Sequence, residues 1–224
     1  MQIIIYFISR CINLIQYFYG LISGKSLFYI NVHKWFALDG NENHLINYEL
    51  DATSTVMEVG WYKWVFTDDI ISKFDCNLYI FEPIRAYYDI LVEKYKNNSK
   101  VHIYRFGLGK ENGTLDLWLL DDGTSAFKSG KTETVDIKKL SEFLAENKIS
   151  NVDLISINIE WGEYDLLEDM ISTESVGYFK NIQVQFHDFV TDAQKLRESY
   201  IQKLSKTHNK TYSFPFVWEW FIHK

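Results

Sequence analysis

Residues 55–64 have the sequence Thr-Val-Met-Glu-Val-Gly-Trp-Tyr-Lys-Trp, in which a short apolar run ends in an acid and a glycine. A parallel strand that is covered on both faces has such a continuous apolar sequence. A glycine at the following turn suits a site where the backbone must approach a ligand, because glycine has no side chain. We therefore predict a first parallel strand over residues 55–60 and a helix from about Trp64 to Phe74.

The same pattern recurs in residues 77–83, Asn-Leu-Tyr-Ile-Phe-Glu-Pro, where an apolar strand carries Glu82 at its C-terminal end. In nucleotide-binding parallel sheets, an acid about 20 residues after the first glycine turn hydrogen-bonds the ribose hydroxyl groups. This spacing predicts a ribose-binding role for Glu82. A second interpretation is that Glu82 only stabilises the next helix N-terminus, which is worth about 0.3–1 kcal/mol.

Farther along the chain, strand patterns alternate with helix patterns. We predict strands over 101–106, 152–159 and 181–187, and helices over 86–95, 138–147, 163–171 and 192–206. We also predict a hairpin strand over 115–119, with 133–137 as its partner or a neighbour, and an antiparallel ending over 212–222. This alternation predicts an α/β fold with a mostly parallel, doubly wound sheet and an antiparallel C-terminal strand. Ligands bind such sheets at the C-terminal strand ends. The residues expected there are Glu58, Gly60, Glu82, Gly107, Asn158, Glu160 and His187.

The N-terminal residues 2–22 have a helical period with a wide apolar stripe formed by Ile4, Ile8, Cys11, Ile15, Phe18 and Ile22. Arg10 at the centre would cost about 3 kcal/mol in a membrane span, so spanning is not expected. We expect this helix to pack on the domain or on a second subunit, as in a homodimer, or to lie on a membrane as a peripheral contact. Residues 23–50 predict a connecting segment that covers the ligand site. The chain then divides into an N-terminal segment over 1–50 and a main domain over 51–224.

Composition limits the function classes. The chain has 224 residues, 47% of them hydrophobic, which suits one globular unit. Its net charge of −7 and its lack of a Lys/Arg stripe argue against nucleic acid as a partner. The two cysteines, Cys11 and Cys76, have no CxxC spacing, so no metal site or disulfide framework is expected and a cytoplasmic location fits best.

Several sequence blocks, taken in order, resemble the FkbM-type methyltransferase family. They are Glu58-Val59-Gly60, Phe81-Glu82-Pro83, Phe106-Gly107-Leu108-Gly109, Ile157-Asn158-Ile159-Glu160-Trp161-Gly162-Glu163-Tyr164-Asp165-Leu166-Leu167, Gln183-Val184-Gln185-Phe186-His187 and Trp218-Glu219. The resemblance extends over roughly residues 54–222. Its most specific parts are the Phe-Glu-Pro block and the block that begins at Ile157.

This resemblance implies a Rossmann-like class I fold and an S-adenosylmethionine-dependent methyltransferase that acts on a hydroxyl of a sugar or related small metabolite. The acceptor partner would then be a small molecule or a carbohydrate. The residues on the cofactor side would be Glu58, Gly60, Trp61, Glu82, Pro83, Phe106, Gly107 and Asn158. Those on the methyl-transfer side would be Glu160, Glu163 and His187. A metal site formed by the last three has suitable ligand types but a nonspecific spacing.

Two residues depart from the family pattern, which has glycine where this chain has Trp64 and Trp161. A Trp64 side chain that pointed into the site would overlap the methionine part of the cofactor, whereas one that pointed into the helix–sheet interface would not. Trp161 could stack on a substrate ring. The alternative hypothesis is a methyltransferase-fold protein that has lost cofactor binding and serves as an interaction module. A nicotinamide-dependent dehydrogenase is disfavoured because no GxGxxG follows the first strand.

Overall fold

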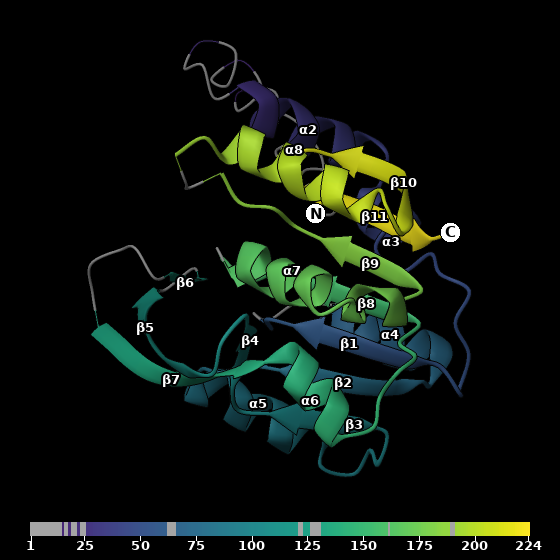
Figure 1. The fold of residues 1–224 in the computed structure, drawn as a ribbon, viewed down its shortest axis with the longest axis vertical. Helices are drawn as coiled ribbons and strands as arrows, with labels where there is room; N and C mark the ends of the chain where they lie inside the picture. Colours follow the sequence, from purple (N-terminus) through teal and green to yellow (C-terminus); the bar gives the residue numbers. More distant parts are fainter. Residues whose placement is uncertain are drawn as a thin grey trace, which may run out of the picture.

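The computed structural model describes residues 15, 18, 22, 26–61, 66–120, 123–125, 131–160, 162–188 and 191–224, and these form one central sheet with helices on both faces (Figure 1). The strands of this sheet are β1 (Thr55–Val59), β2 (Asn77–Phe81), β3 (Val101–Tyr104), β8 (Leu154–Ile157), β9 (Asn181–Val184), β10 (His208–Phe214) and β11 (Trp218–His223). The helices are α4 (Phe66–Phe74), α5 (Arg85–Tyr95), α6 (Leu140–Glu146), α7 (Gly162–Ser172) and α8 (Ala193–Leu204), with a short 3₁₀ helix η1 (Ser175–Tyr178).

The strand order is β10-β11-β9-β8-β1-β2-β3, and β11 alone among these strands runs in the opposite direction to the rest. Starting from β1, the chain first builds outward through β2 and β3 and then returns to the other side of β1 at β8. The boundary between β1 and β8 is therefore the topological switch point, where ligands bind in open parallel sheets. The predicted fold class, including the antiparallel C-terminal strand, is confirmed.

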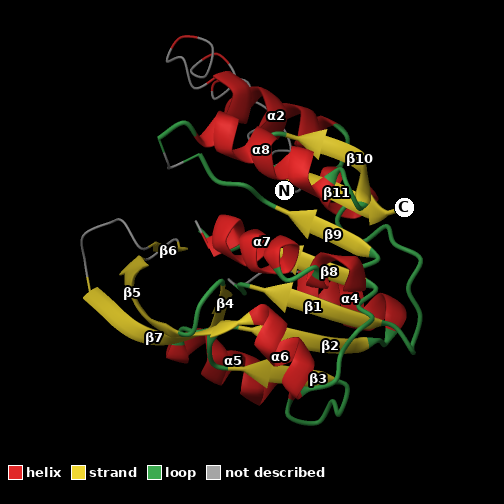
Figure 2. Cartoon of the chain, in the orientation of Figure 1, coloured by secondary structure: helices red, strands yellow, loops and turns green. Residues whose placement is uncertain are grey.

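The pleat of the strands explains why their apolar runs are continuous. In β1, Met57 and Val59 face the core beneath α6, α7 and α8, whereas Val56 faces the core beneath α4 and α5. Both faces are covered by helices, as Figure 2 shows. Each fully buried aliphatic side chain contributes about 1.5–3 kcal/mol. Glu58 is therefore an acid on a strand that is otherwise packed on both sides.

A second sheet of four strands lies beside the C-terminal strand ends, with the order β4-β7-β5-β6. Its members are β4 (Gly107–Gly109), β5 (Gly113–Leu120), β6 (Gly123–Ser125) and β7 (Lys131–Lys139). The predicted hairpin of 115–119 with 133–137 is confirmed, because β5 and β7 pair antiparallel. The prediction that the third strand reaches residue 106 is wrong. Gly107 instead starts β4 and pairs with Ile137 of β7, close enough that a Cβ atom would lie 2.8 Å from Ile137 Cδ1.

The segment before β1 is helical, so the prediction of a connecting segment over 23–50 is wrong for most of its length. It contains α2 (Ser26–Ala37) and α3 (Gly40–Asn43). Trp35 on α2 is buried in the same core cluster as Val56 of β1, and its ring packs edge-on against Phe214 of β10. The helical spacing of the residues that face the core is weak because α2 also has apolar residues on its exposed side.

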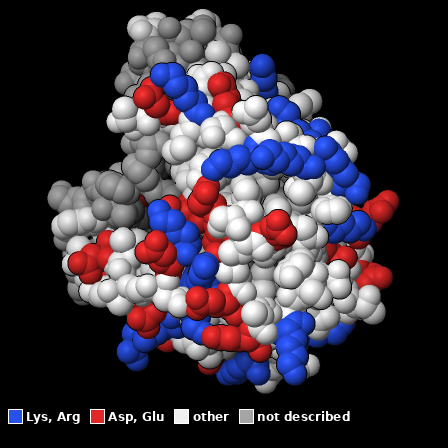
Figure 3. All heavy atoms as spheres, viewed as in Figure 1, with Lys and Arg blue, Asp and Glu red and all other residues white. Residues whose placement is uncertain are grey.

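The predicted N-terminal helix over 2–22 lies outside the described residues, apart from Ile15, Phe18 and Ile22. These three are helical and exposed. No helix in the described part of the chain has the length and apolarity that crossing a membrane requires. On the face drawn in Figure 3, basic and acidic side chains are interspersed rather than gathered into a single patch.

Candidate functional site

At the switch point, the backbone of the turn after β1 lies very close to the backbone that follows β8. Gly60 has a φ angle of 86°, in the left-handed region that side chains disfavour. A Cβ atom at this position would lie 2.3 Å from the carbonyl oxygen of Asn158, which follows β8. The Gly60 N–H donates to Phe81 O at 3.0 Å, and the Asn158 N–H donates to Val59 O at 3.0 Å. Glycine is therefore required where the ends of β1, β2 and β8 meet.

Glu82 lies at the end of β2 and is held by main-chain donors. Its Oε2 accepts the Trp61 N–H at 3.0 Å, and its Oε1 accepts the Ile84 N–H at 2.8 Å. The side chain is buried, and this burial raises the pKa of the Glu82 carboxyl to about 8. Each carboxylate oxygen has more than one acceptor position, so both retain capacity for a ligand hydroxyl.

Glu58 is the second buried acid at this edge. Its Oε2 accepts a hydrogen bond of 2.6 Å from Thr67 Oγ1, which lies on α4. Burial raises the pKa of the Glu58 carboxyl to about 8, and the Thr67 hydrogen bond opposes this rise. The charge of Glu58 also raises the pKa of Glu82, which couples the two acids. Desolvation therefore favours the protonated form of both until a positive charge comes close.

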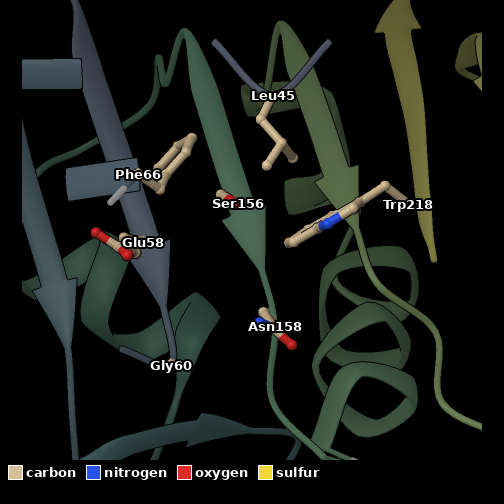
Figure 4. Close-up of a pocket in the computed structure, with 7 residues that line it drawn as sticks. All are labelled: Leu45, Glu58, Gly60, Phe66, Ser156, Asn158 and Trp218. Atoms are coloured by element: carbon tan, nitrogen blue, oxygen red, sulfur yellow. The ribbon is translucent and has the colours of Figure 1, made fainter. Parts of the chain in front are cut away.

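A small pocket opens along β1 and β8 (Figure 4). In Figure 4, Ser156 and Asn158 lie on the middle strand, with Glu58 on one side and Trp218 on the other. The lining residues are Leu45, Glu58, Gly60, Phe66, Ser156, Asn158 and Trp218. The pocket combines apolar and aromatic walls with a few polar groups, which is the usual composition of a small-molecule site.

A row of polar side chains crosses the sheet beside the pocket. Strand register places Glu58 next to Ser156, and Ser156 next to Gln183 of β9. Gln183 Nε2 donates to Ser156 Oγ at 3.0 Å, and Tyr48 Oη donates to Gln183 Oε1. The hydroxyl hydrogen of Ser156 is thereby directed away from Gln183, so it can serve the pocket. Tyr48 also ties the segment before β1 to the sheet.

Two consecutive residues of α7, on the face of the sheet opposite the pocket, contact His187. Glu163 is fully buried, and its Oε1 accepts the His187 N–H at 2.9 Å and lies 3.3 Å from His187 Nδ1. Tyr164 Oη donates to the His187 carbonyl oxygen at 3.3 Å. The backbone of His187 is thus fixed on both sides. The strand predicted to end at His187 stops earlier, at Val184.

Glu160 lies in the turn before α7, because this helix begins at Gly162 rather than at 160. Glu163 is therefore on the helix, as predicted, whereas Glu160 precedes it. Buried oxygens of both acids, Glu160 Oε2 and Glu163 Oε2, have no hydrogen-bond partner in the described part of the chain. Among the described residues, no group of three or more His, Cys, Asp or Glu side chains is arranged to hold a metal ion.

The remaining predicted cofactor residues surround these groups. Trp61 is buried against Tyr87, and its Nε1 has no hydrogen-bond partner among the described residues. A Cβ atom on Gly107 would lie 3.8 Å from Pro83 Cγ, so the two residues are close neighbours. The Phe106 ring packs against Phe81, with ring centroids 5.8 Å apart, so its side chain belongs to the core. Only the backbone at Phe106 and Gly107 remains as a ligand surface.

Sequence reasoning missed Leu45, Phe66, Thr67, Ser156 and Tyr164. Of these five residues, Ser156 could have been noticed in the sequence, because it is polar within a buried apolar strand. The contacts of the other four depend on how the strands and helices pack. Trp218 was present in the family resemblance without a role, and it lines the pocket. Trp64 and Trp161, on which the alternative of lost cofactor binding depends, lie outside the described residues.

Comparisons with known proteins identify the family. The family model for the methyltransferase FkbM domain matches residues 56–223, whereas no curated protein matches the chain. Among solved structures, methyltransferase FkbM from Methylobacillus flagellatus KT has a TM-score of 0.54 at 11% identity, over 78% of this chain and 45% of that one. This chain thus spans less than half of that protein.

Two further structures are more distant. The Methanococcus jannaschii fibrillarin pre-rRNA processing protein has a TM-score of 0.48 at 12% identity, over 77% of this chain and 67% of that one. The N-methyltransferase NodS from Bradyrhizobium japonicum WM9, in complex with S-adenosyl-L-homocysteine, has a TM-score of 0.39 at 11% identity, over 76% and 78% of the two chains. At 11% identity, the likeness to the methyltransferase FkbM structure supports the fold alone. Because the family model covers most of the sequence, the chain belongs to the methyltransferase FkbM domain family.

Proposed function

We propose that this protein is an S-adenosylmethionine-dependent O-methyltransferase that acts on a hydroxyl of a sugar or related small metabolite. Its family and fold are those of S-adenosylmethionine-dependent methyltransferases. The observation that carries the finer assignment is the pair formed by buried Glu163 and His187. A carboxylate beside one imidazole nitrogen orients the ring and favours the tautomer whose other nitrogen accepts a proton.

The residues at the ends of β1 and β2 fit the cofactor. Glu82 is fixed by two main-chain donors and retains acceptor capacity for ribose hydroxyls. The Trp61 indole N–H, a buried donor whose partner is not found among the described residues, belongs to the same turn that donates to Glu82. Glu58 supplies a carboxyl on the pocket wall for the positively charged end of the ligand. The polar atoms at this edge therefore match a ligand with hydroxyl donors and a positive charge.

Methyl transfer to a hydroxyl then needs a positioned acceptor and a proton acceptor. S-adenosylmethionine supplies an electrophilic methyl group on a sulfonium, which needs no metal for activation. With Nδ1–H directed to Glu163 Oε1, His187 Nε2 can accept the proton that the acceptor hydroxyl loses as its oxygen–methyl bond forms. Glu163 stabilises the resulting imidazolium. Tyr164 and the Glu163 contact to the main chain keep the ring in place.

The charge of the site favours a neutral acceptor. Glu58, Glu82, Glu160 and Glu163 all lie at the same C-terminal edge of the sheet. When a bound positive charge has ionised Glu58 and Glu82, the carboxylates at this edge repel a phosphate or carboxylate on a substrate, and such like-charge contacts cost several kcal/mol. A neutral polyol avoids this repulsion and can donate hydroxyl hydrogens to the carboxylates. We therefore place sugars and related polyhydroxy metabolites ahead of phosphorylated acceptors.

The test is transfer of an isotopically labelled methyl group from S-adenosylmethionine to a panel of neutral sugars, sugar phosphates and amines, with products assigned by mass spectrometry. The wild-type protein is expected to form methyl ethers of neutral sugars. His187→Gln, which keeps the side-chain size but not the basicity, is expected to lower the transfer rate about 10²–10⁴-fold, the usual contribution of a general base.

The matched control is His102→Gln, on β3 and outside this site, which should leave the rate unchanged. An enzyme that binds the cofactor but methylates amines in preference to hydroxyls would contradict the proposed acceptor class. A His187→Gln variant with the wild-type rate would contradict the assigned base. Failure of the wild-type protein to bind the cofactor at millimolar concentration would favour an interaction module without methyltransferase activity.

A further inference from the structure

Helix α2 has a second apolar side that faces away from the sheet. Its inward residues, including buried Asn31 and Trp35, contact the C-terminal strands, and Asn31 Nδ2 donates to Pro215 O at 3.3 Å. The outward side includes four residues at helical spacing, namely Leu27, Ile30, Lys34 and Ala37. Ile30 is half-buried, and the other three are exposed. Phe36 and Leu38, at the end of the helix, are 49% and 53% exposed. Among these exposed residues of α2 and its end, Lys34 is the basic one and the others are apolar.

Exposed apolar residues also occur just before α2. Ile15 and Ile22 are helical, and 68% and 86% of their surfaces are exposed. They belong to the apolar stripe that the sequence shows over residues 2–22, so at these two positions the stripe faces outward rather than into the domain. Large exposed apolar residues that cluster in one region mark an interaction surface, whereas single ones do not. We define the N-terminal apolar surface as Ile15, Ile22, Leu27 and Leu38.

Charge indicates what covers this surface. Residues 1–38 contain Arg10, Lys25 and Lys34 but none of the 30 Asp and Glu residues of the chain, the first of which is Asp39. The protein as a whole has a net charge of −7. A basic, apolar segment on an acidic protein is attracted to an anionic lipid surface, where apolar side chains enter the interface and Lys or Arg side chains reach the head groups.

A second copy of the chain fits less well. A two-fold dimer through this surface would bring two like-charged basic segments together, because each copy presents the same patch. An anionic bilayer instead offers the opposite charge. We propose that the N-terminal apolar surface docks this protein on the surface of a bilayer that contains anionic lipids.

Docking through α2 would also fix the orientation of the pocket. Trp35 of α2 packs on β10, and Tyr48 bonds to Gln183 in the central sheet. Leu45 from the same segment lines the pocket. The α2 part of the docking surface and the pocket thus belong to one packed core, so contact through α2 would orient the pocket relative to the bilayer.

The experiment is cosedimentation of the full-length protein with vesicles of phosphatidylcholine alone and of an equal mixture of phosphatidylcholine and phosphatidylserine. We expect binding to the mixed vesicles that weakens as salt rises, and little binding to phosphatidylcholine alone. Lys34→Gln should lower the partition coefficient about fivefold, the effect of one basic residue near an anionic surface. Leu27→Glu with Leu38→Glu should lower it at least about tenfold.

The control is Ile90→Glu on α5, where an apolar side chain is 47% exposed outside the N-terminal apolar surface. This variant should bind the vesicles as the wild type does, which separates docking from a general loss of hydrophobicity. All variants are compared for unfolding by denaturant, so that misfolding is recognised. Wild-type protein that ignores both vesicle types overturns the proposal. A wild-type dimer in sedimentation velocity that Leu27→Glu with Leu38→Glu makes monomeric would assign the surface to a second copy instead.

Discussion

Glu58 and Glu82, at the ends of β1 and β2, differ from Glu163 on α7 in what their carboxyl groups contact. The first two accept hydrogen bonds from a hydroxyl or from main-chain N–H groups, and burial raises the pKa of each to about 8. Glu163, equally buried, lies beside the His187 imidazole. The same edge of the sheet thus has buried acids in two different environments. In the proposed function, the acids of β1 and β2 receive a positively charged ligand, whereas the acid of α7 orients the His187 ring.

The largest effect expected from this difference is on the pH dependence of stability. The pKa of Glu58 is about 8 in the folded protein, against an ordinary value of 4.5 for a glutamic acid in the unfolded chain, so the folded state binds more protons between these values. The unfolding free energy therefore falls as pH rises from about 4.5 to 8, by roughly 3–5 kcal/mol for each such acid. Glu58→Gln should remove the Glu58 part of this fall and leave the Glu82 part.

The measurement is urea unfolding of the wild type, Glu58→Gln and the exposed control Glu111→Gln between pH 5 and pH 9, a range of about 4 units around these pKa values. Glu58→Gln should be more stable than the wild type at the high end of the range and flatter throughout. If the unfolding free energy of all three proteins had the same pH dependence, Glu58 would have an ordinary pKa. The difference proposed between Glu58 and Glu163 would then be contradicted.

A smaller effect, on stability alone, is expected at the junction of the two regions. Gly60→Ala places a Cβ atom 2.3 Å from Asn158 O at a φ of 86°. Strain and overlap should lower the unfolding free energy by about 3 kcal/mol. Gly113→Ala is the control, because nothing lies within 4 Å of its Cβ position. Equal stability of the two variants would mean that β1 and β8 are not held as closely as described.

The smallest expected effect concerns the α7 side. Tyr164→Phe removes the hydroxyl that donates to His187 O and should cost about 1 kcal/mol. Because Tyr164 positions the backbone of His187 rather than touching substrate, the variant should lower the rate of methyl transfer while the dissociation constant of the cofactor stays unchanged. A change in cofactor affinity with an unchanged transfer rate would place Tyr164 in the other region.

The sequence predicted this architecture where one residue pattern has one physical meaning. The apolar runs of β1, β2, β8 and β9 were recognised because both faces of a parallel strand are buried, and Gly60 and Glu82 mark strand ends. The partners of those residues were not predictable. That Thr67 faces Glu58, or that Ser156 neighbours Gln183, depends on register and helix docking.

The same dependence on packing explains why the sequence did not predict α2 or the second sheet. Helix α2 has apolar residues on its exposed side as well as on the side that faces the core, so its period is weak and the segment resembled a connection. The sheet of β4 to β7 forms because Gly107 leaves the central sheet and pairs with Ile137, a contact between residues far apart in sequence. Leu45 reaches the pocket for a similar reason, since its role depends on how the segment before β1 packs.

The most direct measurement of the central claim is calorimetric titration of the protein with S-adenosylmethionine at pH 7, in two buffers with different ionisation enthalpies. If Glu58 and Glu82 receive the cationic cofactor, binding should ionise them, and protons released to the buffer should make the heat differ between the two buffers. Glu58→Gln should reduce that difference. Binding with the same heat in both buffers, or no binding, would contradict the account.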